Sequence, residues 1–319
     1  MGDWSLAGPA NASLASIVVP VYNGAATVGE CVASLLAMRL DRARFEIVVV
    51  DNGSTDATLD MLRGFGDQLR VLGEPTRGAA AARNRGIREA LGRVVAFTDA
   101  DCVVDEEWLG ALLESLADPT IGVVGGTVLS RTPCNRIERF GEMIHDQRTA
   151  IEDNNIPYVI TGNWASPRDV LLEVGLFDES LQRGQDVDLS WRIHRAGYRF
   201  VYQPRARVFH RNEHTLWGLV QEGFVHGVHG VRVRDKHLAL EPRHGLSRGT
   251  SPGKRLGRDL RQLARKGDRI NASLRLLFDM GKTSGELLAR ARPPKSRDGV
   301  RPDAQAAPSV SDSNQVTPE

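Results

Sequence analysis

Short apolar runs alternate with amphipathic segments over the first hundred residues of the chain. Residues 16–20, 45–50 and 93–97 are rich in valine and isoleucine, a composition typical of strands buried on both faces of a parallel sheet. Apolar residues recur at helical spacing over residues 28–36, and the alanine-rich residues 79–91 predict another helix. This alternation predicts an α/β fold with a mostly parallel central sheet flanked by helices.

Polar clusters follow three of the predicted strands, at residues 20–23, 51–56 and 99–101. In an open α/β sheet, ligands bind in the crevice beyond the carboxyl ends of the strands. We therefore expect the three clusters to line one crevice.

The second half of the chain has a less regular pattern. Residues 122–210 mix predicted short strands and helices, with two short strands leading to residue 210, whereas residues 214–231 and 252–278 have helical spacing. We predict four parts: a flexible lead-in over residues 1–14, an α/β domain over 15–212, a basic helical extension over 213–292, and a disordered tail over 293–319.

Charge is distributed unevenly along the 319 residues, although the net charge is only +1. Residues 232–301 contain 19 lysines and arginines against 7 aspartates and glutamates, so the remaining chain is acidic. A basic amphipathic helix can lie on an anionic membrane surface. The alternative is a helix that packs its apolar face on the α/β domain. Nucleic-acid binding is not expected, because aromatic residues are sparse in this region.

No segment reaches the roughly 18–20 consecutive apolar residues that span a bilayer. The N-terminal region also lacks a basic stretch followed by an apolar one. The three cysteines have no metal-binding spacing and are interpreted as reduced, mostly buried thiols. We expect a cytoplasmic protein, with the inner face of the membrane as the alternative location.

Asp99 and Asp101 are candidates for metal chemistry because one residue separates them directly after a predicted strand. Both carboxylates can reach one hard divalent cation such as Mn²⁺ or Mg²⁺, which keeps positions for phosphate oxygens. His210 ends a later predicted strand, and its ring nitrogen could complete the ligand set. The alternatives are an ordinary acidic turn for the aspartates and a structural role for the histidine.

Four further side chains could contact a ligand. Asp51 ends a predicted strand and can accept hydrogen bonds from a base or ribose, or simply shape the loop. Arg83 lies on a predicted helix and suits a phosphate, unless that helix face is only solvated. Asp186 opens a helix, where the helix dipole alone favours an acid, but it could also take a proton from a hydroxyl. Trp164 could stack on a sugar or be buried.

Taken together, the motifs resemble those of the family 2 glycosyltransferases with the GT-A fold, in family order over roughly residues 15–212. The matching motifs are Val-Pro-Val-Tyr-Asn (19–23), Val-Asp-Asn-Gly-Ser-Thr-Asp (50–56), Arg-Gly (77–78), Ala-Arg-Asn-x-Gly (82–86), Thr-Asp-Ala-Asp (98–101), Thr-Gly-Asn-Trp (161–164), Val-Gly-Leu-Phe-Asp (174–178), Gly-Gln-Asp-x-Asp-Leu (184–189) and Ala-Gly-Tyr (196–198). The resemblance makes residues 15–212 the expected catalytic domain.

The resemblance implies a donor site for a nucleoside-diphosphate sugar, with a UDP-sugar favoured. Residues expected to line the nucleotide pocket are Pro20, Asn23, Asp51, Gly78, Arg83 and Asp99. The Asp-x-Asp motif would place Asp99 near the ribose and diphosphate and Asp101 on the metal. His210 fits a strand-end histidine that holds the metal or the diphosphate in some members of the family.

The resemblance also implies an inverting single displacement, with Asp186 as the general base. Trp164 and Asp188 are expected to contact the acceptor, a glycan or glycolipid hydroxyl of the kind used in cell-envelope polysaccharide synthesis. Gln185 departs from the family, in which a glutamate often precedes the base. We expect this change to make Asp186 slightly more acidic without loss of its role.

Two other functions are compatible with parts of this pattern. A sugar transferase acting on a polyprenyl phosphate would not need Asp186, because a phosphate is already ionised. A non-catalytic nucleotide-sugar-binding module would be expected to lack Asp101 or Asp186, and both are present.

Overall fold

The computed structural model describes residues 15–240, 257, 260 and 268–291. The predicted lead-in over residues 1–14, the predicted tail over 293–319 and most of the predicted helical residues 252–267 lie outside the described residues. Within the described part, none of the helices is long and apolar enough to span a bilayer.

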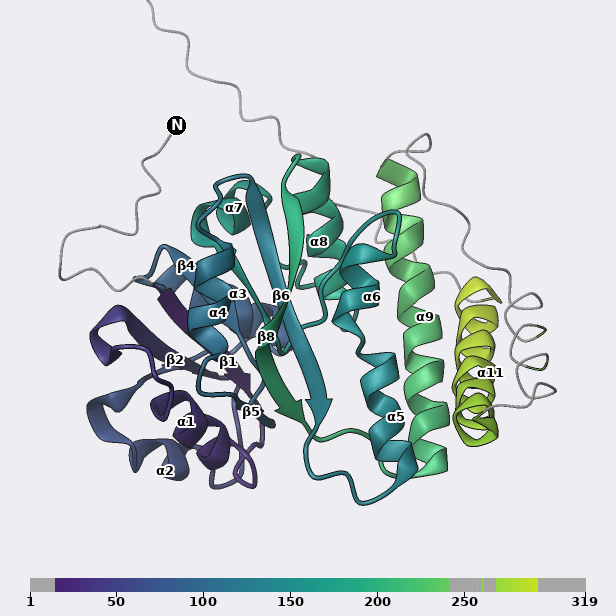
Figure 1. The fold of residues 1–319 in the computed structure, drawn as a ribbon, viewed down its shortest axis with the longest axis horizontal. Helices are drawn as coiled ribbons and strands as arrows, with labels where there is room; N and C mark the ends of the chain where they lie inside the picture. Colours follow the sequence, from purple (N-terminus) through teal and green to yellow (C-terminus); the bar gives the residue numbers. More distant parts are fainter. Residues whose placement is uncertain (1–14, 241–256, 258–259, 261–267, 292–319) are drawn as a thin grey trace, which may run out of the picture.

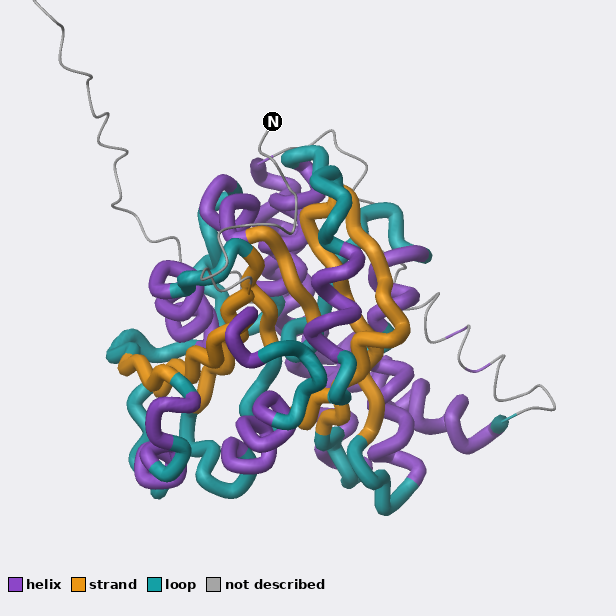
Figure 2. Tube along the Cα trace, turned by 60° about the vertical axis from the view of Figure 1, so that its left-hand side comes forward, coloured by secondary structure: helices purple, strands orange, loops and turns teal. Residues whose placement is uncertain are grey.

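Eight strands form one mixed sheet in the described part of the chain, and helices lie on both of its faces (Figures 1 and 2). The strands are β1 (Ala15–Val21), β2 (Phe45–Asp51), β3 (Arg70–Gly73), β4 (Val94–Phe97), β5 (Cys102–Val104), β6 (Ile121–Ser130), β7 (Trp164–Pro167) and β8 (Arg199–His210). The helices are α1 (Val28–Leu36), α2 (Thr58–Arg63), α3 (Ala79–Glu89), α4 (Trp108–Ser115), α5 (Arg136–Ile144), α6 (Gln147–Glu152), α7 (Arg168–Glu173), α8 (Gln185–Arg195), α9 (Leu216–Leu240) and α11 (Arg269–Ala291).

The strand order is β3-β2-β1-β4-β7-β6-β8-β5. The first four strands in this order are parallel, as the alternating pattern predicts. β7 pairs antiparallel with both β4 and β6, so it joins the parallel N-terminal half to the rest of the sheet. β6 and β8 are parallel, and β5 is antiparallel to β8.

The two short strands expected before residue 210 are one long strand, β8. Its register against β6 shifts between Gly126 and Thr127, where the partner changes from Gln203 to Arg207. Pro204 lies in this irregular segment, and a proline has no N–H group to donate to a strand ladder. The sequence pattern is interrupted by the proline, whereas the strand continues past it.

Two separate apolar cores cover the two faces of the sheet. One contains Ile17 and Val19 of β1 and the inward residues of α1 and α4. The other contains Val18 of β1 with residues of α3 and α8. Because both faces of β1, β2 and β4 are buried, these strands are almost continuously apolar.

Helices α9 and α11 pack side by side next to α5 (Figure 1). A methyl group on Gly227 of α9 would lie 2.0 Å from the backbone oxygen of Lys282, and one on Gly281 of α11 would lie 2.1 Å from that of Val220. Only glycine allows the two backbones to approach so closely. Leu274 and Phe278 of α11 are buried in a cluster with α5 and α9. For Leu274 and Phe278 the structure therefore favours the alternative in which the apolar face of the helix packs on the protein and does not face a membrane.

Candidate active site

The carboxyl end of the sheet opens into a cavity of about 1650 Å³. Its lining includes Arg83 of α3, Asp99 and Asp101 after β4, Asp186 of α8 and His210 of β8. These five side chains come from four elements that are far apart in the sequence. Of the three polar clusters expected to line one crevice, only the cluster at residues 99–101 contributes to this lining.

The remaining predicted nucleotide-site residues lie at neighbouring strand ends and are not part of this lining. The Asp51 carboxylate accepts hydrogen bonds from the backbone N–H groups of Gly53 and Ser54, both at 3.2 Å. Asn23 has a φ of 51°, and its side-chain oxygen accepts the N–H of Thr55 at 2.8 Å. These bonds tie the loop after β1 to the loop after β2.

Asn52, which sequence reasoning did not single out, fixes the start of α3. Its side-chain amide donates to the backbone oxygens of Glu74 and Thr76, and its oxygen accepts the N–H of Gly78 at 2.7 Å. Gly78 has a φ of 127°, a conformation that L side chains rarely adopt. Pro20 lies in β1, one residue before the strand ends.

Arg83 connects three parts of the site. Its Nη2 donates to Oδ1 of Asp99 at 2.6 Å, and its Nη1 donates to Oε1 of Gln185 at 3.3 Å. The side chain is almost completely buried, so these contacts hold the guanidinium in a fixed position. Gln185, the residue that departs from the family pattern, therefore contacts Arg83 through a neutral amide.

Asp101, Cys102 and His210 form the one group of potential metal ligands found among the described residues, with ligand atoms within 4.8 Å of one another. Strand pairing explains the arrangement, because Cys102 of β5 lies directly opposite His210 of β8. Oδ2 of Asp101 is 3.5 Å from Nε2 of His210, and Nδ1 of His210 is 2.9 Å from Oδ1 of Asn212.

The charges in this group keep the Asp101 carboxylate ionised and the His210 imidazole protonated, so His210 would have to release its proton to bind a metal ion. Desolvation alone would lower the pKa of His210, but the hydrogen bond and charge of Asp101 outweigh it and raise the pKa to about 9. Desolvation would raise the pKa of Asp101, but the contact with His210 holds it below its usual value. Burial raises the pKa of the Cys102 thiol, which therefore stays protonated and is a poor ligand. One carboxylate and one imidazole suit a divalent ion such as Mn²⁺.

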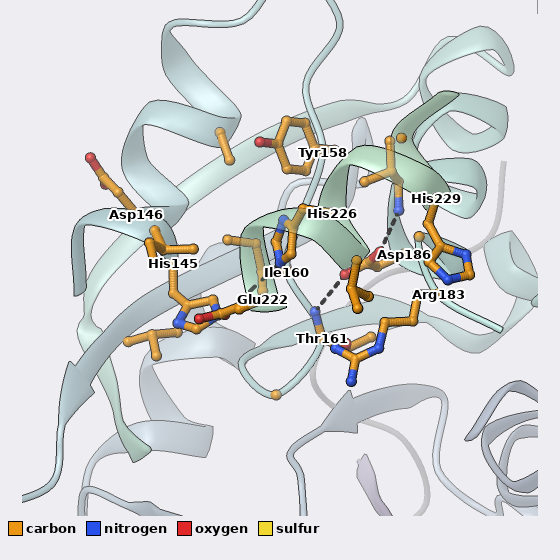
Figure 3. A pocket seen from close by; sticks show the side chains of 18 of the residues that line it. His145, Asp146, Tyr158, Ile160, Thr161, Arg183, Asp186, Glu222, His226 and His229 are labelled. Carbon is orange, nitrogen blue, oxygen red and sulfur yellow. Dashed lines mark hydrogen bonds and ion pairs between the residues drawn. The ribbon is translucent and has the colours of Figure 1, made fainter. Parts of the chain in front are cut away.

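Asp186 lies in the first turn of α8 and faces the cavity (Figure 3). Its Oδ2 accepts the backbone N–H of Thr161 at 3.2 Å, and its Oδ1 accepts that of Val187 at 2.9 Å. Many protein atoms surround the carboxyl group although part of the residue remains accessible. Desolvation raises the pKa of Asp186 in spite of these bonds and the charge of Arg83. This carboxylate is thus more basic than an ordinary aspartate. The effect of Gln185 relative to a glutamate at the same position stays a prediction.

The structure contradicts the expected sugar contacts of Trp164 and Asp188. Trp164 is 1% exposed and stacks on Phe97 with ring centroids 4.6 Å apart, so its ring faces are covered by the core. The Asp188 side chain is fully buried and bonded to Arg192, Lys236 and His237. Trp164 points from β7 into the apolar core, and Asp188 lies on the inner face of α8. Both side chains therefore contribute to the fold instead of facing the cavity.

Sequence reasoning missed the part of the cavity that α9 contributes. His145 at the end of α5 and Glu222, His226 and His229 of α9 all line it (Figure 3). None of them belongs to a recognised motif. The available signal was the spacing of Glu222 and His226, two polar residues four positions apart that lie on the same face of a helix.

Comparison with known proteins agrees with these features. The sequence profile described as Glycosyl transferase family 2 matches residues 16–175, about half of the chain. The glycosyltransferase AglE of Haloferax volcanii is 31% identical over 196 residues, which are 59% of this chain and 63% of that protein. The pre-mycofactocin glycosyltransferase of Mycobacterium tuberculosis is 33% identical over 211 residues, 63% of this chain and 43% of that protein. The chain thus spans less than two thirds of either relative.

Solved structures share the fold. A mannosyltransferase from Pyrobaculum calidifontis, PcManGT, in complex with GDP-Man and Mn²⁺, matches over 90% of both chains with a TM-score of 0.63 and 21% identity. GalNAc-T7 with UDP, GalNAc and Mn²⁺ matches over 76% of this chain and 53% of that one, with a TM-score of 0.50 and 22% identity. The predicted α/β architecture is confirmed as the GT-A fold. By profile and fold together, this chain belongs to glycosyl transferase family 2.

Proposed function

We propose that this protein transfers a sugar from a nucleoside-diphosphate sugar to a hydroxyl group of a glycan or glycolipid acceptor, with inversion at the anomeric carbon. The observation that carries the proposal is the position of a basic carboxylate, Asp186, in the same cavity as the Asp101–His210 pair and the Arg83–Asp99 pair. Membership of the family supports the same reaction class.

In this proposal, the donor lies across the carboxyl ends of β1, β2 and β4. Asp51 and the loop that it supports hold the base and ribose, and Asp99 holds the ribose and diphosphate beside Arg83. Arg83 is fixed by its partners before the donor binds, so little conformational entropy is lost on binding. PcManGT binds GDP-Man, whereas the sequence motifs favour a UDP-sugar, so both bases belong in a donor screen.

A divalent metal, Mn²⁺ or Mg²⁺, fits the donor atoms of Asp101 and His210. When bound, such an ion neutralises the negative charge of the departing diphosphate. The two structural neighbours that contain Mn²⁺ support this assignment. Cys102 lies close to the ligands but contributes a protonated thiol.

Asp186 acts on the acceptor. Its carboxylate takes the proton of the acceptor hydroxyl while the hydroxyl oxygen forms a bond to the anomeric carbon, on the side opposite the diphosphate. The bond from the anomeric carbon to the phosphate oxygen breaks at the same time, and its electron pair leaves with the diphosphate. The raised pKa of Asp186 brings this base closer to neutral pH, where general bases are most effective.

The four-part division of the chain also remains our proposal, with residues 15–212 as the catalytic domain and residues 213–292 as an extension. The buried cluster of α5, α9 and α11 joins the described helices of the extension to the domain. Co-sedimentation with anionic vesicles at low salt tests whether the extension also contacts a membrane.

A donor screen tests the proposed reaction. Purified protein is incubated with Mn²⁺ and a panel of UDP-, GDP- and dTDP-sugars, and nucleotide release is followed for the wild type, Asp101→Ala and Asp186→Asn. We expect metal-dependent release of one nucleotide, lost in both variants. Binding of a donor without release of its nucleotide would instead support a non-catalytic nucleotide-sugar-binding module. Turnover with a polyprenyl phosphate that survives in Asp186→Asn would support the phosphate-directed transferase.

A further inference from the structure

The cavity continues past Asp186 into a polar lobe, which we define by His145, Glu222 and His226. His145 follows α5, and the other two residues lie one turn apart on α9 (Figure 3). Helix α9 lies outside the residues that match the family profile. Two of the three residues of the lobe, Glu222 and His226, therefore lie outside the matched residues.

Glu222 holds the polar lobe together. Its Oε1 is 3.5 Å from Nε2 of His145 and 3.9 Å from Nε2 of His226. The Glu222 side chain is 16% exposed, so it is enclosed by protein yet still reaches the cavity. Trp191 of α8 also lines the cavity. Among the described residues, Nδ1 of His145 and Nε1 of Trp191 have no hydrogen-bond partner.

The charges in the polar lobe are arranged for hydroxyl groups. Desolvation would raise the pKa of Glu222, but the contact with His145 outweighs it and keeps the carboxylate ionised. Desolvation, with some contribution from Lys282 and Arg183, lowers the pKa of His226 to about 4, so this imidazole is neutral at neutral pH. A carboxylate between imidazoles accepts hydrogen bonds from sugar hydroxyls.

We propose that Glu222, His226 and His145 form the acceptor subsite, and that this subsite binds the hydroxyl groups of an uncharged sugar ring. The inference deepens the proposed function and rests on it. Asp186 and the polar lobe line the same cavity (Figure 3), and the His145 ring packs edge-on against His210 with centroids 5.6 Å apart. A ring held by Glu222 therefore lies in the cavity that contains the base. A polyprenyl phosphate has no hydroxyl-rich ring to place there.

Direct binding tests the subsite without requiring turnover. Saturation-transfer NMR measures binding of a panel of methyl α- and β-hexopyranosides, and of farnesyl phosphate, to the full chain. The variants are Glu222→Gln and His226→Asn, with Asp235→Asn as the matched control. Asp235 is an exposed acid on the same helix and outside the cavity lining.

We expect at least one glycoside to bind the wild type and Asp235→Asn equally, and to bind Glu222→Gln and His226→Asn at least tenfold more weakly. Circular dichroism checks that each variant is folded. Unchanged glycoside binding in a folded Glu222→Gln would overturn the assignment. So would tighter binding of farnesyl phosphate than of every glycoside, or no glycoside binding to the wild type.

Nucleotide binding separates this result from a failure of the proposed function. Calorimetry with UDP and GDP in the presence of Mn²⁺ is carried out on the same proteins. We expect one nucleotide to bind all of them with the same affinity. If a nucleotide binds but Glu222→Gln leaves glycoside binding unchanged, only the acceptor subsite is wrong. If no nucleotide binds the wild type, the transferase itself is in doubt.

Discussion

Oδ1 of Asp188 lies 2.9 Å from Nε2 of His237, and both side chains are completely buried between α8 and α9. Nδ1 of His237 is 2.6 Å from Nη2 of Arg195, so a neutral imidazole that donates through Nε2 satisfies both neighbours. Lys236 adds a 2.6 Å contact to the same oxygen of Asp188. Asp188 follows Asp186 by two residues, and His237 lies on the helix that carries Glu222. This pair therefore fixes the proposed base relative to the proposed acceptor subsite.

Removing the Asp188 carboxylate should destabilise the protein strongly. Asp188→Ala leaves Lys236 and Arg192 without their buried partner, and breaking such a pair costs about 3–5 kcal/mol. Urea unfolding measures the change in the free energy of unfolding. Asp235→Ala, which removes an exposed acid from α9, should stay within about 0.5 kcal/mol of the wild type. A loss of stability below about 1 kcal/mol in Asp188→Ala would contradict the inferred role.

The same carboxylate predicts how stability depends on pH. Desolvation would raise the pKa of Asp188, but bonds from His237, Lys236 and Arg192 hold it well below its usual value. A depressed carboxyl pKa stabilises the folded state above the unfolded pKa of about 3.9, and this contribution is lost as the pH falls. Unfolding free energies measured from pH 7 downward should fall more steeply for the wild type than for Asp188→Asn. If the unfolding free energy fell equally with pH in both proteins, the Asp188 carboxylate would not stabilise the folded state in this way.

Asp186→Asn should abolish transfer without weakening the fold. Loss of a general base reduces the rate by about 10²–10⁴. Burial raises the pKa of this carboxyl, so the ionised form destabilises the folded protein near neutral pH, and a neutral amide should leave the stability equal or higher. Nucleotide release, nucleotide calorimetry and urea unfolding give the three measurements. A variant that transfers sugar at the wild-type rate would exclude Asp186 as the base.

The pH dependence of transfer should report on Asp186. Because its pKa is raised, the carboxylate becomes protonated at a higher pH than an ordinary aspartate would. The acid limb of kcat/KM should therefore lie at a higher pH than the usual aspartate pKa, with activity falling as the pH decreases. The activity is measured at a saturating metal concentration, so that loss of the metal at low pH does not cause a similar decrease in kcat/KM. An acid limb below the usual aspartate pKa would contradict the raised value.

Two glycines of α9 offer a matched test of the α9–α11 contact. A methyl group at Gly227 meets the backbone of Lys282 at 2.0 Å, whereas one at Gly230 has no heavy atom within 4 Å. Gly227→Ala should cost about 1–3 kcal/mol of unfolding free energy. Gly230→Ala should increase it by about 0.5–1 kcal/mol, because alanine favours the helix. If the two variants behaved alike in urea unfolding, close backbone packing would not govern this contact.

The local pattern of apolar and polar residues was sufficient to predict the N-terminal half of the fold. Strands such as β1 and β2 are apolar on both faces, and that composition identifies a buried parallel strand without tertiary information. Asp99 and Asp101, at the end of β4, line the cavity, whereas the polar residues at the ends of β1 and β2 lie outside its lining. Asp186 was identified as an acid in the first turn of a predicted helix, and α8 begins one residue before it, at Gln185.

Other features depend on contacts between distant residues. Trp164 and Asp188 carry side chains that suit a sugar, and only their complete burial excludes that role. Cys102 meets His210 because an antiparallel strand pairs them, although 107 residues separate the two positions along the chain. The polar lobe around Glu222 forms because glycines let α9 and α11 pack closely beside α5. The sequence by itself determined the strands, their polar ends and the family, since these follow from local composition. Tertiary packing alone decided which polar side chains face the cavity, because burial and pairing arise from segments that meet only in the folded chain.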